Sequence, residues 1–218
     1  MNLSSSLAIA LLASAITISS ANAADRDYAV GLTAGTMGIG VSASTNLIEK
    51  LNLRANISGY EYKHSGTYGS DVNYDIKMKL FGTGLLADYF PFDNGFRLTG
   101  GAYYNGNKFT MDSKSDTATV TVGNNSYSGA NTSLKDEIKY QKIAPYIGLG
   151  WGNPLDKDGK IKVGVDVGAM YTGSPKVSVS GSSNISQSDL AIEQADIQKE
   201  ADKLKWWPLI AVSVTYKF

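Results

Sequence analysis

The sequence predicts an all-β fold, an antiparallel transmembrane β-barrel of eight strands with a short amphipathic helix before the last strand. Three observations predict it. Apolar and polar residues alternate over segments of roughly ten residues, which suffice to cross a bilayer as tilted strands. Short and long connections alternate between these segments, as in bacterial barrels with periplasmic turns and external loops. No stretch after residue 23 is long and apolar enough for a transmembrane helix.

The first 23 residues have the pattern of a secretory signal peptide. Leu7–Ile18 is a weakly apolar run, too short to cross a bilayer as a helix, and the small-residue triplet Ala21-Asn22-Ala23 follows it. No Lys or Arg precedes the run, so positive charge there comes from the amino terminus alone. We expect cleavage after Ala23 and one exported barrel domain over residues 24–218.

The amino-acid composition excludes several classes of function and of binding site. Lys plus Arg (20) balance Asp plus Glu (20), and the predicted signal carries no ionisable side chain, so nothing attracts nucleic acid. The absence of cysteine excludes disulfides and thiolate sites, and no motif indicates a cofactor. The 23 glycines, 13 tyrosines and only 5 prolines favour many strands, tight turns and aromatic belts.

The first strand region, residues 28–43, is ambiguous. Apolar residues alternate with small ones on both sides of Gly35-Thr36-Met37-Gly38, which fits one kinked strand or two strands with a tight turn. Bacterial single-chain barrels have an even number of strands and both termini in the periplasm. That rule requires two strands here and eight in all, with ten as the open alternative.

Residues 51–60, 72–89 and 96–107 predict the next strands. In residues 72–89 the alternation changes phase near Gly82-Thr83-Gly84, which predicts a β-bulge. A short turn with Pro91 leads to the following strand. Residues 143–151 and 161–172 form a predicted hairpin across the turn at 153–159, with glycines on the inner face that leave room for bulky neighbours.

The longer connections are predicted external loops. They span His64–Asp71, Asp112–Glu137 and Ser178–Lys205, and they are rich in Ser, Gly, Asn, Thr and Asp. In the last of them Leu190, Ile197, Ala201 and Leu204 recur at helical spacing, which predicts the short amphipathic helix. We expect this helix to rest on the barrel rim; a separate partner-binding element is the alternative.

The last strand ends in large apolar residues at every second position, from Ile210 to Phe218. This is the pattern of a strand with one face in lipid. A terminal phenylalanine with an aromatic residue two before it resembles the C-terminal signal read by the barrel-assembly machinery. The resemblance implies that Tyr216 and Phe218 form an assembly signal and that this machinery is a partner during biogenesis.

Further short segments carry a family resemblance. They are AGTMGIG at 34–40, DYFPF at 88–92, FRL at 96–98, APYIGLGWG at 144–152 and GSPKV at 173–177. Through them the chain resembles small eight-stranded outer-membrane proteins of the OmpA-like and opacity-protein kind, in a proteobacterial branch. The resemblance implies a place in the cell outer membrane of a Gram-negative bacterium and leaves the activity open.

The inward phase of the predicted strands carries both signs of charge. Its charged residues are Arg54, Asp75, Lys77, Lys79, Asp88, Arg97, Lys162 and Asp166. An eight-stranded barrel is about wide enough for its own side chains, so we expect a lumen charge network that closes the bore. A closed bore predicts that the protein has a structural or surface-interaction function. The main alternative is a narrow porin-like channel for small solutes, with basic side chains favouring anions.

Enzymatic and metal chemistry have weaker signals. His64, the single histidine, neighbours Ser65, but adjacent strand residues point to opposite faces, so a lipid-modifying enzyme is the least favoured reading. Acidic residues at 193, 196, 200 and 202 could attract divalent cations, yet Lys199 and Lys203 make a solvated helix face the simpler interpretation. We expect no enzyme and no metal, and a monomer whose partners are outer-membrane lipid and lipopolysaccharide.

Overall fold

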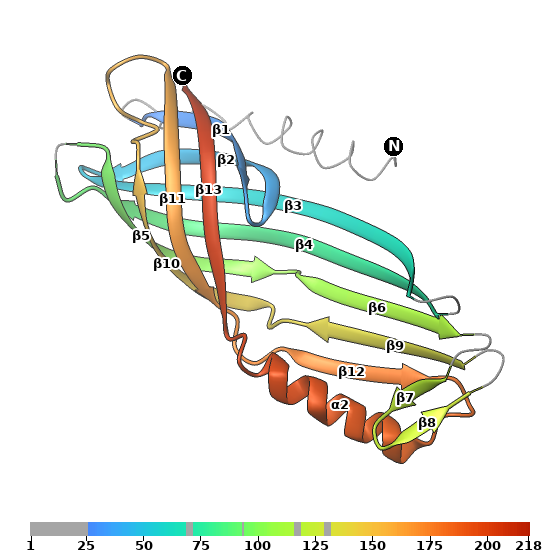
Figure 1. Cartoon of the computed structure of the whole chain (residues 1–218). Helices are drawn as coiled ribbons and strands as arrows, with labels where there is room; N and C mark the ends of the chain where they lie inside the picture. Colours follow the sequence, from blue (N-terminus) through green and yellow to red (C-terminus); the bar gives the residue numbers. More distant parts are fainter. Residues whose placement is uncertain (1–25, 69–71, 93, 116–118, 129–131) are drawn as a thin grey trace.

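Figure 1 shows the computed structural model, which describes residues 26–218 except 69–71, 93, 116–118 and 129–131. Antiparallel strands and one helix make up this part of the chain. The elements are β1 (Tyr28–Gly35), β2 (Gly38–Ile48), β3 (Leu51–Tyr68), β4 (Val72–Tyr89), β5 (Phe96–Asn105), β6 (Lys108–Ser115), β7 (Val120–Val122), β8 (Asn125–Tyr127), β9 (Thr132–Lys139), β10 (Ile143–Trp151), β11 (Ile161–Tyr171), β12 (Lys176–Gly181), α2 (Gln187–Ala201) and β13 (Trp206–Lys217). The predicted signal peptide at 1–23 lies outside the described residues.

Eight of the described strands close into a ring. They follow one another in the order β1, β2, β3, β4, β5, β10, β11 and β13, and β13 returns to β1 with Tyr216 opposite Val30. The prediction of an antiparallel eight-stranded barrel is confirmed. The ambiguous segment forms two strands, because Thr36 and Met37 turn the chain and Gly38 takes a φ of 91°, a conformation that favours glycine.

The outside of the ring is apolar, as a lipid-facing surface requires. Large side chains such as Ile147, Val163 and Ile210 are more than half exposed there. Aromatic pairs mark one edge of this belt: Phe81 against Tyr104 and Tyr171 against Trp206. Such aromatic girdles mark membrane–water interfaces in outer-membrane barrels. No helix among the described residues is both long enough and apolar enough to cross a membrane.

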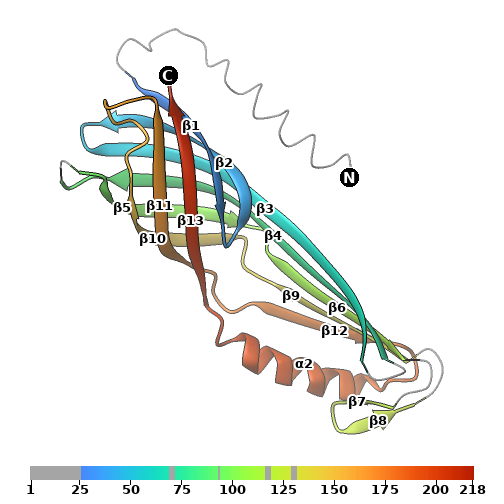
Figure 2. The same ribbon diagram turned by 45° about the horizontal axis from the view of Figure 1, so that its top comes forward.

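A second sheet continues from one end of the ring (Figure 2). β3 and β4 are 18 residues long, and their far halves run on into a sheet with the order β3-β4-β6-β9-β12. We call this part the distal sheet; it comprises residues 60–68, 72–79, 108–115, 132–139 and 176–181. The prediction of loops at 112–137 and 178–205 is therefore wrong for much of their length, because polar segments form strands where neighbouring strands supply the ladder hydrogen bonds. The loop predicted at 64–71 is wrong over residues 64–68, which belong to β3, and its residues 69–71 lie outside the described part of the chain.

The predicted bulge in β4 is also wrong. β4 pairs with β3 in unbroken register from Leu51 opposite Tyr89 to Tyr68 opposite Val72. Even-numbered β4 residues stay on one face throughout. In the ring this face points into the lumen, whereas beyond Leu80 it becomes the more buried and apolar face of the distal sheet, carrying Ile76 and Met78. The sequence pattern changes because the surroundings of the strand change.

The predicted amphipathic helix is present as α2, which lies along β12 (Figure 1). Ser186 caps its N-terminus by accepting a hydrogen bond from the Asp189 amide. Gln198 and Gln194 accept hydrogen bonds from the Val177 and Val179 amides at 3.0 and 3.3 Å. These two side chains therefore satisfy the outer edge of β12, which would otherwise invite pairing with another chain. Leu190 and Ala201 are buried as predicted, whereas Leu204 follows the helix and is exposed.

Candidate functional site: the closed lumen

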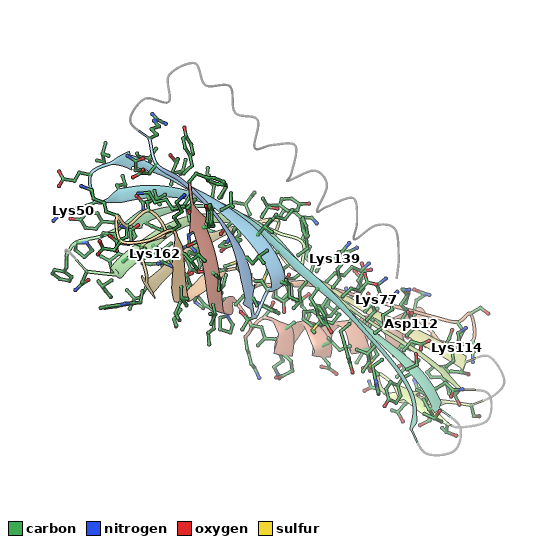
Figure 3. All side chains as sticks on the ribbon, turned by 90° about the horizontal axis from the view of Figure 1, so that it is seen from above. Lys50, Lys77, Asp112, Lys114, Lys139 and Lys162 are labelled. Carbon is green, nitrogen blue, oxygen red and sulfur yellow. The ribbon has the colours of Figure 1, made fainter. Side chains whose placement is uncertain are left out.

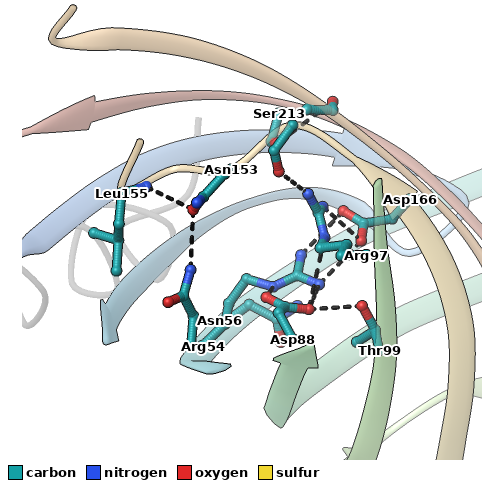
Figure 4. Close-up of polar contacts among 12 residues, drawn as sticks. Arg54, Asn56, Asp88, Arg97, Thr99, Asn153, Leu155, Asp166 and Ser213 are labelled. Atoms are coloured by element: carbon teal, nitrogen blue, oxygen red, sulfur yellow. Dashed lines mark hydrogen bonds and ion pairs between the residues drawn. The ribbon is translucent and has the colours of Figure 1, made fainter. Parts of the chain in front are cut away.

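Four of the predicted charges meet inside the ring. Arg54 on β3, Asp88 on β4, Arg97 on β5 and Asp166 on β11 are all buried, with at most 9% of each residue exposed. Figure 4 shows the two guanidinium groups and the two carboxylates converging from different strands. We call these four residues the charged layer. Its two positive and two negative charges balance.

Arg54 is the centre of the charged layer. Its Nε and Nη2 donate to the Asp88 carboxylate at 2.8 and 2.9 Å, and its Nη1 and Nη2 donate to the Asp166 carboxylate at 3.0 and 2.9 Å. Both contacts use two parallel hydrogen bonds, which fix the planar groups against one another.

Arg97 completes the charged layer. Its Nη2 donates to Asp166 Oδ1 at 2.9 Å, its Nε lies 3.6 Å from Asp88 Oδ1, and its Nη1 donates to the Gly152 carbonyl. Thr99 Oγ1 also donates to Asp88 Oδ1, at 2.6 Å. A Cβ at Gly150 would stand 2.7 Å from Arg97 Nε, so an inward glycine provides the space that this guanidinium occupies.

An apolar layer lies next to the charged layer in the ring. Its buried members are Met37, Leu86, Tyr103, Tyr146, Met170 and Leu209. The two tyrosine rings meet edge to face at 5.5 Å, and Asn56 donates to the Tyr103 hydroxyl at 2.8 Å. Toward the distal sheet, Trp207 packs against this layer and against the rings of Phe109 and Tyr140. Side chains thus fill the lumen on the distal side of the charges.

The turn between β10 and β11 lies at the other end of the ring, beside the end of β13, where the Lys217 amide donates to the Lys160 carbonyl. Pro154 and Leu155 are buried. Asn153 Oδ1 accepts hydrogen bonds from Asn52 Nδ2 and from the Leu155 amide, both at 3.0 Å. A cavity of about 30 Å³ remains around the charged layer, lined by Pro154 of this turn at one end and by Tyr103 and Tyr146 of the apolar layer at the other. That is space for roughly one or two water molecules.

The remaining predicted lumen charges lie elsewhere. Asp75, Lys77 and Lys79 stand on the exposed, outward face of the distal sheet, where β4 pairs with β6. Their predicted place in the lumen is wrong, because it depended on the bulge that β4 lacks. Lys162 does face inward, near the β10–β11 turn, and forms an ion pair with Asp156 at 3.2 Å.

The apolar layer is the part of the lumen that the sequence did not reveal. Tyr103 and Tyr146 stand on the inward phase of their strands, but nothing local shows that their rings meet. One signal was available: inward glycines face them, since a Cβ at Gly148 or Gly168 would lie within 2.4 Å of the Tyr146 hydroxyl. Large inward residues beside inward glycines indicate a filled bore.

The weaker candidate residues for catalysis and metal binding are not part of a catalytic or metal-binding arrangement among the described residues. His64 lies on the exposed part of β3, stacked 6.3 Å from Tyr62, and Ser65 points to the opposite face. No group of metal-binding side chains occurs within the part of the chain that the structure describes. Of the acidic residues on α2, Glu193 accepts a hydrogen bond from the Gly123 amide, and Glu200 forms an ion pair with Lys203.

The predicted assembly residues end the last strand. Tyr216 and Phe218 are exposed, with their rings edge to face at 5.4 Å. The Phe218 amide donates to the Tyr28 carbonyl at 3.0 Å, so the end of the chain takes part in the seam that closes the ring.

Comparison with solved structures agrees with this architecture. CarO2 of Acinetobacter baumannii is 27% identical over 88% of this chain and 98% of its own, with a TM-score of 0.60. CarO of the same organism is 24% identical over 87% and 97%, with a TM-score of 0.58. CarO is an eight-stranded outer-membrane barrel. No protein-family model and no curated protein matches the sequence. The closed ring, its lipid-facing belt and this likeness show that the chain is a small eight-stranded β-barrel protein located in the bacterial outer membrane.

Proposed function

We propose that this protein is a structural or surface-interaction protein with a plugged lumen. The observation that carries the proposal is the succession of closures along the ring: the β10–β11 turn, the charged layer and the apolar layer. A bore filled in this way gives solutes no continuous aqueous path. The part of the molecule left to meet other molecules is the distal sheet with α2.

The charged layer is costly to open. A solute passing through would have to separate carboxylates from arginines that hold them with paired hydrogen bonds. Breaking a buried ion pair by removing one partner costs about 3 to 5 kcal/mol, because the other charge is left without compensation. Four mutually paired groups raise that cost, so the closed state is the stable one.

A monomer is part of the same proposal. The ring has no free edge, because β13 pairs with both β11 and β1. The edge of β12 is covered by glutamine side chains of α2. Strand edges are the usual route by which sheet proteins associate, and these two are closed. The remaining edge of the distal sheet is β3 beyond Gly59, which pairs with β4 on one side only among the described residues.

A narrow porin-like channel is the second candidate. The cavity of about 30 Å³ beside the charged layer favours it, because Ser42, Ser44 and Lys162 help to line this space and are polar. Lipid-modifying activity is not proposed, since His64 and Ser65 lie on opposite faces of β3.

Reconstitution in planar bilayers tests the proposal. We expect no discrete conductance from the wild-type protein, with its heat-modifiable mobility on a gel confirming that the inserted material is folded. Discrete conductance with a preference for anions would replace the plugged barrel with the channel. Release of fatty acid from the bilayer lipid would show an enzyme instead.

A further inference from the structure

The outward face of the distal sheet carries four lysines side by side. Lys79 on β4 stands opposite Lys108 on β6, Lys108 stands opposite Lys139 on β9, and Lys139 stands opposite Lys176 on β12. We call these four residues the lysine row. It crosses four adjacent strands with no residue of another type between its members.

This arrangement is unfavourable for the isolated protein. Directly opposite residues in an antiparallel sheet have Cβ atoms about 4.5 to 5.5 Å apart, and like charges at that separation destabilise the pairing. Glu137 compensates two members of the row by forming ion pairs with Lys108 and Lys139. These lysines lower the pKa of Glu137, chiefly through their hydrogen bonds to it. Glu61 on β3 stands directly opposite Lys79, although its ion pairs are with Lys63 and Lys77. Within the described part of the chain no ion pair reaches Lys79 or Lys176.

The charge around the row is also mainly positive. Figure 3 shows Lys139, Lys77, Asp112 and Lys114 along one side of the distal sheet. Lys77 shares Glu61 with Lys63, and Asp112 pairs with Lys135. The sequence as a whole has equal numbers of basic and acidic residues, so the basic excess on this face is a segregation of charge.

The lysine row lies just beyond the lipid-facing belt and on the same face. Lys79 precedes Phe81 by two residues along β4, and Lys108 follows Tyr104 by four along the β5–β6 path. Lys139 likewise lies four residues from the exposed Ile143. At about 3.3 Å per residue, the row stands roughly 7 to 13 Å along the strands from the end of the belt. The polar headgroup region is about 5 to 8 Å thick on each side of the hydrocarbon core, so the row lies at the outer part of this region and just beyond it.

We propose that the lysine row binds the phosphate groups of the lipopolysaccharide packed around the barrel. The outer leaflet of this membrane presents phosphate at the depth of the row, and several ammonium groups together suit a surface with several phosphates. An anion at the row would also relieve the repulsion among the four lysines. The inference rests on the outer-membrane location and is independent of whether the lumen is closed.

The test replaces the whole row in the full chain: Lys79→Gln, Lys108→Gln, Lys139→Gln and Lys176→Gln. The proteins are folded in neutral detergent and titrated with purified lipopolysaccharide, with binding followed by the rise in the temperature at which the folded gel band is lost. We expect the apparent affinity to fall about tenfold or more, given the attraction of each surface lysine to an anionic leaflet. The matched control changes Lys157, Lys160, Lys199 and Lys203 to Gln and should bind as the wild type does.

Two further measurements separate binding from misfolding. Without lipopolysaccharide, the row variant should have a heat resistance close to that of the wild type, because the removal of like charges offsets the loss of the two Glu137 ion pairs. If the fourfold variant does not fold, the pair Lys79→Gln and Lys176→Gln, which leaves the Glu137 ion pairs intact, provides the measurement with a smaller loss of affinity.

The same lipopolysaccharide without its phosphates tests whether phosphate is the group that the lysine row binds. We expect the dephosphorylated lipopolysaccharide to stabilise the wild type much less than intact lipopolysaccharide does. We also expect the stabilisation by intact lipopolysaccharide to decrease as the salt concentration is raised. Equal binding by wild type and row variant, or equal stabilisation by the dephosphorylated lipid, would overturn the proposal. Either outcome would leave the planar-bilayer result, and hence the plugged lumen, unaffected.

Discussion

At the scale of residues, the charged layer shows how a narrow barrel accommodates ionised groups. Arg54 alone reaches both carboxylates with paired hydrogen bonds, and Arg97 adds a further donor to Asp166. Each carboxylate is therefore held by both arginines. The layer depends on its balance of charge, because the removal of any member leaves an opposite charge buried without full compensation.

Replacing Arg97 by Ala tests this dependence. Asp166 loses one of its two cationic partners, so we expect a lower free energy of unfolding, by at most about 3 to 5 kcal/mol and by less where water enters the neighbouring cavity. The variant should also begin to conduct in planar bilayers. The measurement is the urea concentration at which half of the folded gel band is lost.

The matched control for Arg97→Ala is Lys162→Ala. Lys162 also faces inward, but its partner Asp156 is half exposed, and such pairs contribute about 0 to 1 kcal/mol. An Arg97→Ala protein as stable as the wild type and silent in bilayers would show that the charged layer neither supports nor closes the barrel.

At the scale of elements, α2 joins the parts of the distal region. The β7–β8 hairpin is bound to the first turn of α2, because the Asp189 carboxylate accepts hydrogen bonds from Asn125 and Tyr127. Leu190 packs with Val122 and Ile185 in a small apolar cluster. The polar and apolar contacts together hold the helix against the end of the distal sheet.

At neutral pH the buried carboxylate charge of Asp136 on β9 destabilises the packing of α2 against the distal sheet. Its Oδ1 is buried without a hydrogen-bond partner. Burial, together with the nearby charges of Glu193 and Asp112, raises the pKa of Asp136 to about 6. A carboxyl group whose pKa is raised in the folded state favours that state when protonated. The stabilisation is complete below the unfolded pKa of about 4 and is lost as the pH rises through about 6.

The substitution Asp136→Asn should remove this dependence. We expect slower hydrogen exchange of the α2 amides at pH 7.5 than in the wild type, and a smaller change in their protection between pH 4 and 7 after correction for intrinsic exchange. Asp196→Asn, on the exposed face of the same helix, is the control and should behave as the wild type does. A wild-type pH profile in Asp136→Asn would assign the dependence to another group.

At the scale of the whole molecule, ring closure joins the two ends of the chain. β1 pairs with β13 over seven residues, from Ala29 opposite Lys217 to Gly35 opposite Ala211. The ring cannot close before β13 is in place, because β13 supplies one side of this seam.

Deleting Phe218 tests the predicted assembly signal. We expect less heat-modifiable protein in the outer membrane while export to the periplasm continues, because the deletion removes an exposed aromatic residue and the hydrogen bond to the Tyr28 carbonyl. Fractionation and gel mobility measure both quantities. Phe92→Ala, another exposed aromatic residue, serves as the control. Wild-type outer-membrane levels of the deletion protein would exclude a role for Phe218 in assembly.

Much of the ring could be predicted from the sequence, because lipid on one side of a strand imposes a local pattern with a period of two. Val163, Val165 and Val167 all face outward as that pattern predicts. The same reasoning placed Arg54, Arg97, Asp88 and Asp166 on the inward phase. The helix at 187–201 was predictable for a similar reason, since its apolar spacing is local.

Tertiary structure alone decided where each strand leaves the membrane and which strand it then pairs with. Asp75, Lys77 and Lys79 alternate with apolar residues in the same way as lumen residues do, but β4 has already passed the ring at Leu80. The lysine row needs the register of four strands, and the charged layer needs residues up to 112 positions apart to meet. Alternation along one strand determines which side a residue takes; the neighbouring strands determine what lies on that side.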